Sequence, residues 1–360
     1  MKAGRTIQEM AREILRQSEA KQDYSVNTAN ILMEAGGGAP MLRLLDNTGI
    51  DRVEPLDIQQ TAHRQLGTYL GIPQKYYDKM LTENVGLLAD NVNSWLSRAS
   101  EYRLLRTIDG RARAFLSDRY RRIDNLDIAN ITLPIIEEMP GAYYESCELT
   151  EDYMYIKVVN PRLTAEVTPG DIVQAGVVIS NSETGLGAVS IQPLVFRLVC
   201  KNGMVVNEAR TRRTHIGRVN TTDKNFFLYS KETLAADDQA FVLKIRDTVR
   251  AAVDEARFAQ VLGKMRESTH LRLNTADIPG VVKLASSSFG ITEAESGGVL
   301  QRLIEDADYT VYGLANAVTR YSQDVENYDR ASQLESIGYT VMTMNPEIFR
   351  RINQVSSMAA

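Results

Sequence analysis

Arginine and aromatic side chains are interleaved between residues 98 and 124, a combination suited to binding an anion. The segment holds eight arginines against four carboxylates, a net charge of +4. Guanidinium groups bind phosphates and aromatic rings stack on bases, so this pattern is typical of single-stranded nucleic-acid binding. The candidate binding residues here are Tyr102, Arg106, Arg111, Arg113, Phe115, Arg119, Arg121 and Arg122.

A second basic segment lies between residues 197 and 224. It has seven Lys and Arg residues against two carboxylates, a net charge of +5, although the whole chain carries −5. A local basic centre inside an acidic chain is what phosphate binding by a soluble protein requires. Ion pairing of these arginines with acidic helices elsewhere in the fold explains the pattern equally well. The candidates here are Arg197, Lys201, Arg210, Arg212, Arg213 and Arg218.

The sequence YRLLRTI, Asp109-Gly110, RARAFLS predicts a tight β-hairpin over residues 102–117. A two-residue Asp-Gly turn sets the register of such a hairpin. The predicted pairs are Ile108 with Arg111, Arg106 with Arg113, and Leu104 with Phe115. Two arginines directly opposite each other repel, so we expect an anion, or carboxylates such as Glu137 and Glu138, to cover them.

The sequence contains few patterns typical of a catalytic, nucleotide-binding or metal site. No phosphate-binding loop and no nucleophile elbow occurs, and the histidines and cysteines lack metal-ligand spacing. Cys200 with His215 would be a nucleophile and base, but a cysteine in a strand is usually an inert apolar residue. We therefore predict no catalytic residue, no metal and no cofactor, and a protein that is not an enzyme. Asp171 and Glu183 keep a metal-dependent nuclease open as a minor alternative.

Composition predicts a globular protein, with 44% hydrophobic and 24% charged residues. The first residues alternate apolar and charged side chains and do not resemble a signal peptide. No stretch approaches the ~18 consecutive apolar residues of a membrane span. Two cysteines are too few for a secreted disulfide framework, so we expect a cytoplasmic location in the host cell, without membrane association.

The pattern of elements predicts an α+β fold with a central antiparallel sheet, hairpins packed by helices, and a helical C-terminal region. Three parts are expected: an N-terminal helix and flexible arm over 1–58, an α+β core over 59–230, and helices over 231–360. Gly36-Gly37-Gly38 before Pro40 indicates the arm. Asn202-Gly203 between apolar runs indicates a second hairpin turn.

Several longer segments resemble one known family. They are HRQLGTYLGIPQKYYDKM, LLADNVNSWL, RLLRTIDGRARAFLSDRYRRIDN, VVISNSETGLGAVSIQPLVFRLVCKNGMVV, RRTHIGR and NAVTRYSQDVENYDRASQLE. In this order they resemble the phage/plasmid-like protein family, domain of unknown function nine-three-two, over about His63 to Glu335. The resemblance implies occurrence on phages, plasmids and other mobile elements. It implies no established reaction, and no catalytic residue carries over.

A second resemblance concerns topology alone. A basic hairpin, a helix, further antiparallel strands and a helical tail are similar to the core of Rad52-like single-strand annealing proteins. That likeness implies a ring or filament that holds one DNA strand in a basic groove, without ATP or metal. Fold-level analogy of this kind does not establish function.

These observations predict an oligomeric protein that binds single-stranded DNA, or another nucleic acid, for annealing, recombination or protection. The alternative is an anti-defence or host-interaction protein of a mobile element, whose basic surface meets an acidic partner. We expect a homo-oligomer because helices with polar seams, such as those carrying Asn316, Thr319 and Tyr321, can build repeated subunit contacts.

Overall fold

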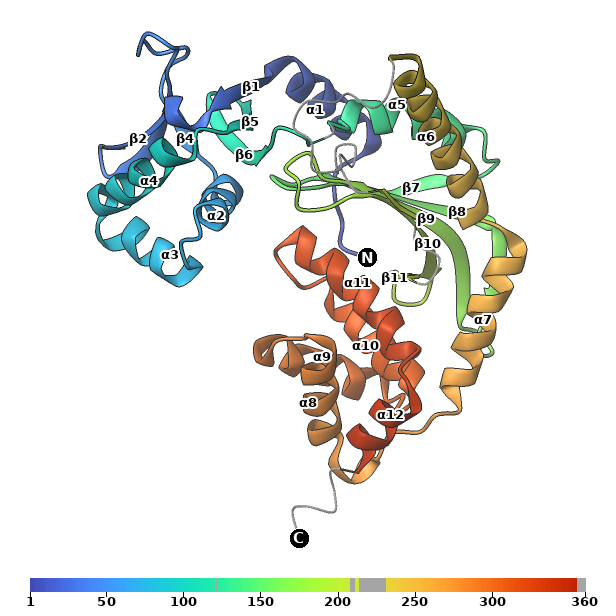
Figure 1. The fold of residues 1–360 in the computed structure, drawn as a ribbon. Helices are drawn as coiled ribbons and strands as arrows, with labels where there is room; N and C mark the ends of the chain where they lie inside the picture. The colour runs from blue at the N-terminus through green and yellow to red at the C-terminus, as the bar shows by residue number, and fades with distance from the viewer. Residues whose placement is uncertain (121, 208–210, 214–230, 355–360) are drawn as a thin grey trace.

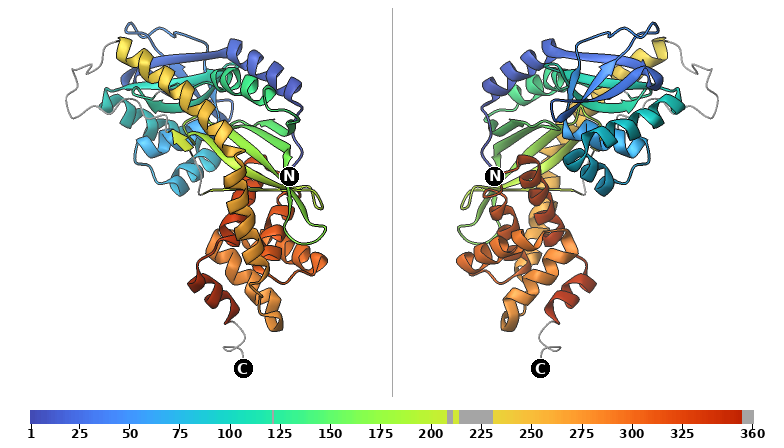
Figure 2. Two further views of the ribbon diagram at one scale, coloured as in Figure 1. Left: turned by 90° about the vertical axis from the view of Figure 1, so that its right-hand side faces the viewer. Right: turned by 90° about the vertical axis from the view of Figure 1, so that its left-hand side faces the viewer.

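The computed structural model describes residues 1–120, 122–207, 211–213 and 231–354 (Figure 1). They form the α+β fold expected from the sequence, with a helical region toward the C-terminus. The strands are distributed between two β-sheets that lie side by side in the upper part of Figure 1. The helical region packs beneath the second sheet (Figure 2).

The first sheet is mixed and has the strand order β1-β5-β6-β4-β3-β2. Its strands are β1 (Lys21–Asn27), β2 (Ile31–Gly36), β3 (Ala39–Leu44), β4 (Leu56–Ile58), β5 (Tyr102–Ile108) and β6 (Arg111–Ser117). Three helices pack on it: α2 (Gln60–Tyr69), α3 (Gln74–Glu83) and α4 (Val85–Ala99). Strands from the predicted 1–58 part therefore pair with strands from the predicted 59–230 part.

The prediction of a flexible arm around the glycine triplet is wrong for residues 31–44. These residues form the antiparallel pair β2–β3, and Gly37 and Gly38 take the positive φ angles of its turn. Alternate side chains such as Met33 and Leu42 are buried under α4. Asn93 of α4 also hydrogen-bonds both the backbone N–H and the carbonyl of Met33, at 2.7 and 2.8 Å.

The hairpin β5–β6 has the predicted turn, and Ile108 pairs with Arg111 as expected. From Arg106 onward the predicted register is wrong, because a β-bulge shifts it between Arg106 and Thr107. Arg106 lies opposite Ala114, not Arg113. A bulge adds one residue to a strand and turns the following side chains to the other face. Phe115 consequently lies in the core of the first sheet, against the ring of Tyr69.

The second sheet is antiparallel and has the order β11-β10-β9-β8-β7, with β12 also paired to β10. Its strands are β7 (Tyr143–Leu149), β8 (Met154–Glu166), β9 (Ile172–Asn181), β10 (Val189–Arg197), β11 (Asn202–Val205) and β12 (Thr211–Arg213). Helices α1 (Ile7–Ala20), α5 (Asn125–Glu137) and α6 (Lys231–Ala252) pack on one face, where Ile156 and Ile179 are buried. On the other face, Val173 and Val195 belong to the core shared with the helical region.

The second predicted turn lies elsewhere. Leu198–Lys201 joins β10 to β11, and Asn202 is a strand residue paired with Arg197. The side chain of Asn202 is buried and donates to Thr319 Oγ1 at 2.5 Å and to Asn316 Oδ1 at 3.3 Å. These contacts with the helical region hold Asn202 in the strand. They also engage Asn316 and Thr319 within the chain, although the sequence suggested them for subunit contacts.

The helical region consists of α7 (Glu255–Thr269), α8 (Ile278–Phe289), α9 (Glu293–Asp306), α10 (Val311–Tyr321), α11 (Tyr328–Met342) and α12 (Pro346–Asn353). Helix α9 begins at a capping box, with Glu295 N–H donating to Thr292 and Thr292 N–H donating to Glu295. Within the described part of the chain, no helix combines the length and apolar character needed to cross a membrane.

Candidate functional site

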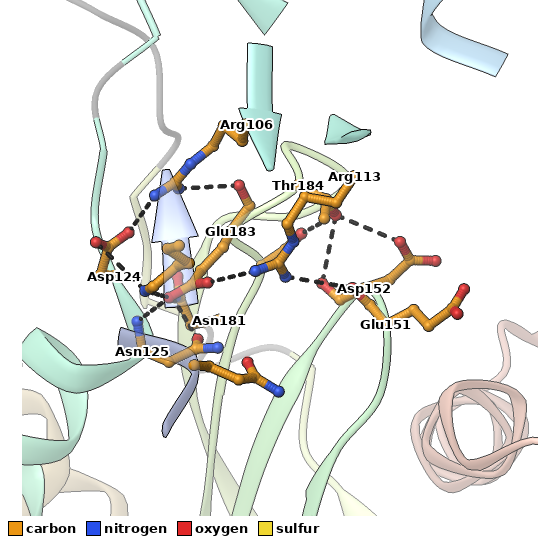
Figure 3. Close-up of polar contacts among 12 residues, drawn as sticks. Arg106, Arg113, Asp124, Asn125, Glu151, Asp152, Asn181, Glu183 and Thr184 are labelled. Atoms are coloured by element: carbon orange, nitrogen blue, oxygen red, sulfur yellow. Dashed lines mark hydrogen bonds and ion pairs between the residues drawn. The ribbon is translucent and has the colours of Figure 1, made fainter. Parts of the chain in front are cut away.

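The two sheets meet at a polar junction built around the loop of residues 182–188, called here the junction loop. It connects β9 to β10 of the second sheet and reaches the first sheet (Figure 3). Gln65 of α2 donates to the carbonyl of Thr184 at 2.7 Å. Tyr120, after β6, donates to the carbonyl of Ser182 at 3.2 Å. Two parts of the chain far apart in sequence are thus joined through polar contacts.

Glu183 is the central residue of this junction and is only 1% exposed. Its Oε1 accepts hydrogen bonds from Lys21 Nζ at 2.8 Å and from the backbone N–H of Asn125 at 2.6 Å. Its Oε2 accepts one from Arg113 Nη1 at 2.9 Å. One carboxylate therefore binds two cations and the first N–H of helix α5.

Arg106 lies beside Glu183 and is likewise 1% exposed. It donates to Asp23 at 3.0 Å, to Asp124 at 2.6 Å and to the carbonyl of Glu183 at 3.1 Å. Asp23 is its cross-strand neighbour on β1, and opposite charges in such pairs attract. Burial lowers the pKa of Arg106, but Asp124 and Asp23 outweigh that effect and raise it above its usual value.

A free phosphate-binding face would require Arg106 and Arg113 to lie on the surface, but both side chains are buried. The structure shows the other possibility, in which carboxylates cover the arginines. The carboxylates are Asp23, Asp124 and Glu183 in place of Glu137 and Glu138. The bulge in β6 directs Arg113 to the junction loop.

Charge in the buried network is balanced. Its cations are Lys21, Arg106 and Arg113, and its anions are Asp23, Asp124 and Glu183. Burial opposes ionisation of Asp124, but Arg106 and Lys21 hold its pKa below the usual value. Removing one partner from a buried pair typically costs about 3–5 kcal/mol, since it leaves an uncompensated charge.

The other predicted binding residues are scattered. Tyr102 is 60% exposed, and Arg111, Arg119 and Arg122 are exposed as well. Phe115 is buried. Arg197 pairs with Asp171 at 2.5 Å, and Lys201 lies in the turn before β11. Arg121, Arg210 and Arg218 fall outside the described residues.

Parts of both basic segments nevertheless approach the junction loop. Arg119 and Arg122 lie on either side of Tyr120, which hydrogen-bonds Ser182 at the start of the loop. At the other end of the loop, β12 with Arg212 and Arg213 pairs with β10 over Val189–Ile191. The fold thus brings together two segments that are about 90 residues apart in the sequence.

Asp171 and Glu183, the carboxylates of the nuclease alternative, do not share a site. They flank opposite ends of β9, a ten-residue strand, so they are separated by ~30 Å. Asp171 accepts hydrogen bonds from Arg197 and from Tyr312 Oη at 2.8 Å, and Glu183 is engaged as described. Among the residues that the structure describes, no three His, Cys, Asp or Glu side chains gather in a way that could hold a metal ion.

Sequence reasoning missed Lys21, Asp23, Asp124 and Asn125. Asp124 and Asp127 have the spacing of a capping box, a signal that could have placed Asp124 at a helix N-terminus. Nothing local indicates that Lys21 and Asp23 belong to a strand paired with Tyr102–Ile108.

The sequence family described as "Domain of unknown function (DUF932)" matches residues 114–351, about two thirds of the chain. The chain belongs to this family. The DUF932 match includes Asp124, Asn125 and Glu183, whereas Lys21 and Arg106 precede it. The junction thus joins the family domain to the strands before it.

Searches of curated proteins and of solved structures return no significant match. The likeness to Rad52-like annealing proteins and an origin on a mobile element therefore gain no support from a relative. Both stay predictions from the sequence.

Proposed function

We propose that this protein binds single-stranded nucleic acid, DNA in the first instance, at the junction of its two sheets. The observation that carries the proposal is the approach of both basic segments to the junction loop, through Tyr120 at one end and β12 at the other. A strand lying across this junction would meet the exposed side chains of Arg119 and Arg122. Their guanidinium groups would hold its phosphates.

The proposed contact residues differ from those expected at first. Arg119 and Arg122 are exposed beside the junction, whereas Arg106 and Arg113 are buried in ion pairs. Arg122 is 53% exposed and lies 3.4 Å from Asp23 at the edge of the network. Phosphate contacts at these side chains would position the strand without reading its sequence.

Tyr102 supplies an exposed ring for base stacking. It is the first residue of β5, and Arg103 beside it pairs with Ser117 at the end of β6. Tyr102 is therefore at the same end of the hairpin as Arg119. Arg111 is at the other end, beside the Asp109-Gly110 turn, ~20 Å away along the strands. Stacking on one aromatic ring contributes ~1–3 kcal/mol per base.

We further propose that the protein acts as a cytoplasmic homo-oligomer and anneals or shields strands without catalysing a reaction. Annealing requires only that strands are held extended with their bases accessible. A strand-annealing assay in EDTA, without nucleotide, tests this role. Acceleration over spontaneous annealing with both strands intact is the expected result. Strand cleavage on adding Mg²⁺ or Mn²⁺ would refute it.

The binding itself is tested by titrating a labelled oligothymidylate with the wild-type protein at several salt concentrations. Because bound cations release counterions from phosphates, affinity should fall steeply between about 50 and 200 mM salt. Absence of binding at the low end of that range would refute the proposed function.

A further inference from the structure

The surroundings of the Glu183 carboxylate have the composition of a phosphate-binding site. Its donors come from three places: Lys21 on β1, Arg113 on β6, and the backbone N–H of Asn125 at the start of the 13-residue helix α5. Lysine, arginine and a helix N-terminus are the groups that proteins use for phosphate. Here a side chain of the same protein supplies the anion (Figure 3).

Charge explains why this position requires an anion. With Glu183 present, the three buried cations are matched by three carboxylates. Without Glu183, Lys21, Arg106 and Arg113 would exceed Asp23 and Asp124 by one positive charge. An uncompensated buried charge is strongly unfavourable. A phosphate group would restore the balance and offer oxygens to the same donors.

The junction loop that delivers Glu183 is held by several polar contacts, and its residues Ser182, Glu183 and Thr184 are at most 1% exposed. Besides Gln65 and Tyr120, Tyr153 donates to the carbonyl of Leu186 at 2.9 Å. The Leu186 side chain itself is 41% exposed. Each hydrogen bond to a neutral group contributes only about 0.5–1.5 kcal/mol net, because water replaces it on opening. Interfaces with this polar character are the ones along which parts of a protein move.

We propose that Lys21, Arg113 and the N-terminus of α5 form a phosphate-binding site that Glu183 fills in the closed arrangement of the junction loop. A phosphate group enters when the loop withdraws and takes the place of the carboxylate. Glu183 is thus an internal competitor that limits access to the site. That the phosphate belongs to a nucleic-acid strand rests on the proposed function.

Thermal unfolding of Glu183→Ala, compared in phosphate and in chloride at equal ionic strength, tests the site. In chloride the variant should unfold at a lower Tm than the wild type. Phosphate should raise that Tm in a saturable way, because a ligand that binds only the native state stabilises it by mass action. The wild-type protein should need a higher phosphate concentration for the same rise, because phosphate must first displace the Glu183 carboxylate.

Three further variants sharpen this measurement. Arg113→Gln combined with Glu183→Ala removes one charge of each sign, so the response to phosphate should disappear. Glu295→Ala breaks a partly exposed ion pair with Arg330 and controls for general effects of phosphate on a protein that has lost a carboxylate. If neither Glu183→Ala nor Glu183→Gln responds to phosphate more than Glu295→Ala does, the proposal is wrong.

Hydrogen exchange on the wild-type protein tests the same idea without a variant. Millimolar phosphate or a short oligothymidylate should speed exchange in peptides from residues 182–188, because the loop withdraws when phosphate binds. Unchanged exchange at a saturating concentration of both would overturn the proposal.

Oligonucleotide binding separates the two proposals. Glu183→Ala should bind oligothymidylate about tenfold more tightly than the wild type, since no carboxylate has to be displaced first. A phosphate response without any oligonucleotide binding would leave the site standing and remove the proposed function. Oligonucleotide binding without a phosphate response would support the proposed function and refute the phosphate site at Glu183.

Discussion

Two buried clusters of charge join the parts of this molecule, and they are built differently. The junction between the sheets uses six ionised groups, and Asp124 and Asp23 at its edge are partly exposed. The contact between the second sheet and the helical region includes a fully buried pair, Lys157 of β8 and Glu335 of α11, which are 2.7 Å apart and both 0% exposed. Lys157 Nζ also lies 4.7 Å from the centre of the Tyr328 ring.

The difference indicates which contact is permanent. The Lys157–Glu335 pair is fully buried, with the rings of Tyr155 and Tyr328 near the Lys157 ammonium, and neither residue is exposed to water. Burial lowers the pKa of Lys157, but Glu335 outweighs that effect and raises it, so the ammonium stays charged. The junction has polar partners that solvent or a ligand can replace. We infer that the Lys157–Glu335 contact stabilises the fold and that the junction between the sheets is the contact that rearranges when a ligand binds.

The largest effect is expected from Glu335→Ala. It leaves the Lys157 ammonium buried without a counter-charge, so the free energy of unfolding should fall by about 3–5 kcal/mol. Urea denaturation followed by circular dichroism measures this loss. The double variant Lys157→Met with Glu335→Leu should recover most of it. A loss below about 1 kcal/mol for Glu335→Ala would show that water reaches the Lys157–Glu335 pair, as it does in surface ion pairs.

A smaller loss is expected from Arg106→Met. It removes the partner of Asp23 and Asp124, but both carboxylates can still turn toward water. The free energy of unfolding should fall by about 2–3 kcal/mol. Arg111→Ala, an exposed position on the same hairpin, is the matched control and should change it by less than about 0.5 kcal/mol. Equal effects of the two variants would contradict the buried network.

The sequence predicted what depends on neighbouring residues. The Asp109-Gly110 turn follows from a short pattern and is confirmed, and the capping boxes at the starts of α5 and α9 are equally local features. The α+β class follows from the order of such elements.

What the sequence did not predict depends on distant contacts. Arg106 is buried because β1, about 80 residues earlier, places Asp23 opposite it. Asn202 lies in a strand and not in a turn because α10 hydrogen-bonds its side chain. The burial of Arg106 and Arg113 was not predicted because their partners come from elements that no local pattern connects to them.

The smallest stability effect should appear on mild acidification. His63 of α2 is buried against Tyr77, with Nδ1 2.9 Å from Tyr77 Oη, and burial lowers its pKa from 6.5 to about 4. Between these values the unfolded chain binds the proton and the native protein does not. Stability due to neutral His63 is therefore complete above pH 6.5 and is lost as the pH falls toward 4.

Between pH 7.5 and 5.5 this loss should be about 1.4 kcal/mol. Urea denaturation of the wild type and of His63→Gln at both pH values measures the difference. Parallel pH profiles for the two proteins would contradict this assignment.

Exposed arginines beside the junction should bind single-stranded nucleic acid. Fluorescence anisotropy with a labelled oligothymidylate tests this claim most directly, comparing Arg119→Glu/Arg122→Glu with Arg350→Glu, an exposed change on α12 far from the junction. The double variant should keep its fold and lose affinity at least about tenfold, because phosphate contacts are replaced by repulsion. Arg350→Glu should bind like the wild type. Wild-type affinity in a folded Arg119→Glu/Arg122→Glu protein would contradict the claim.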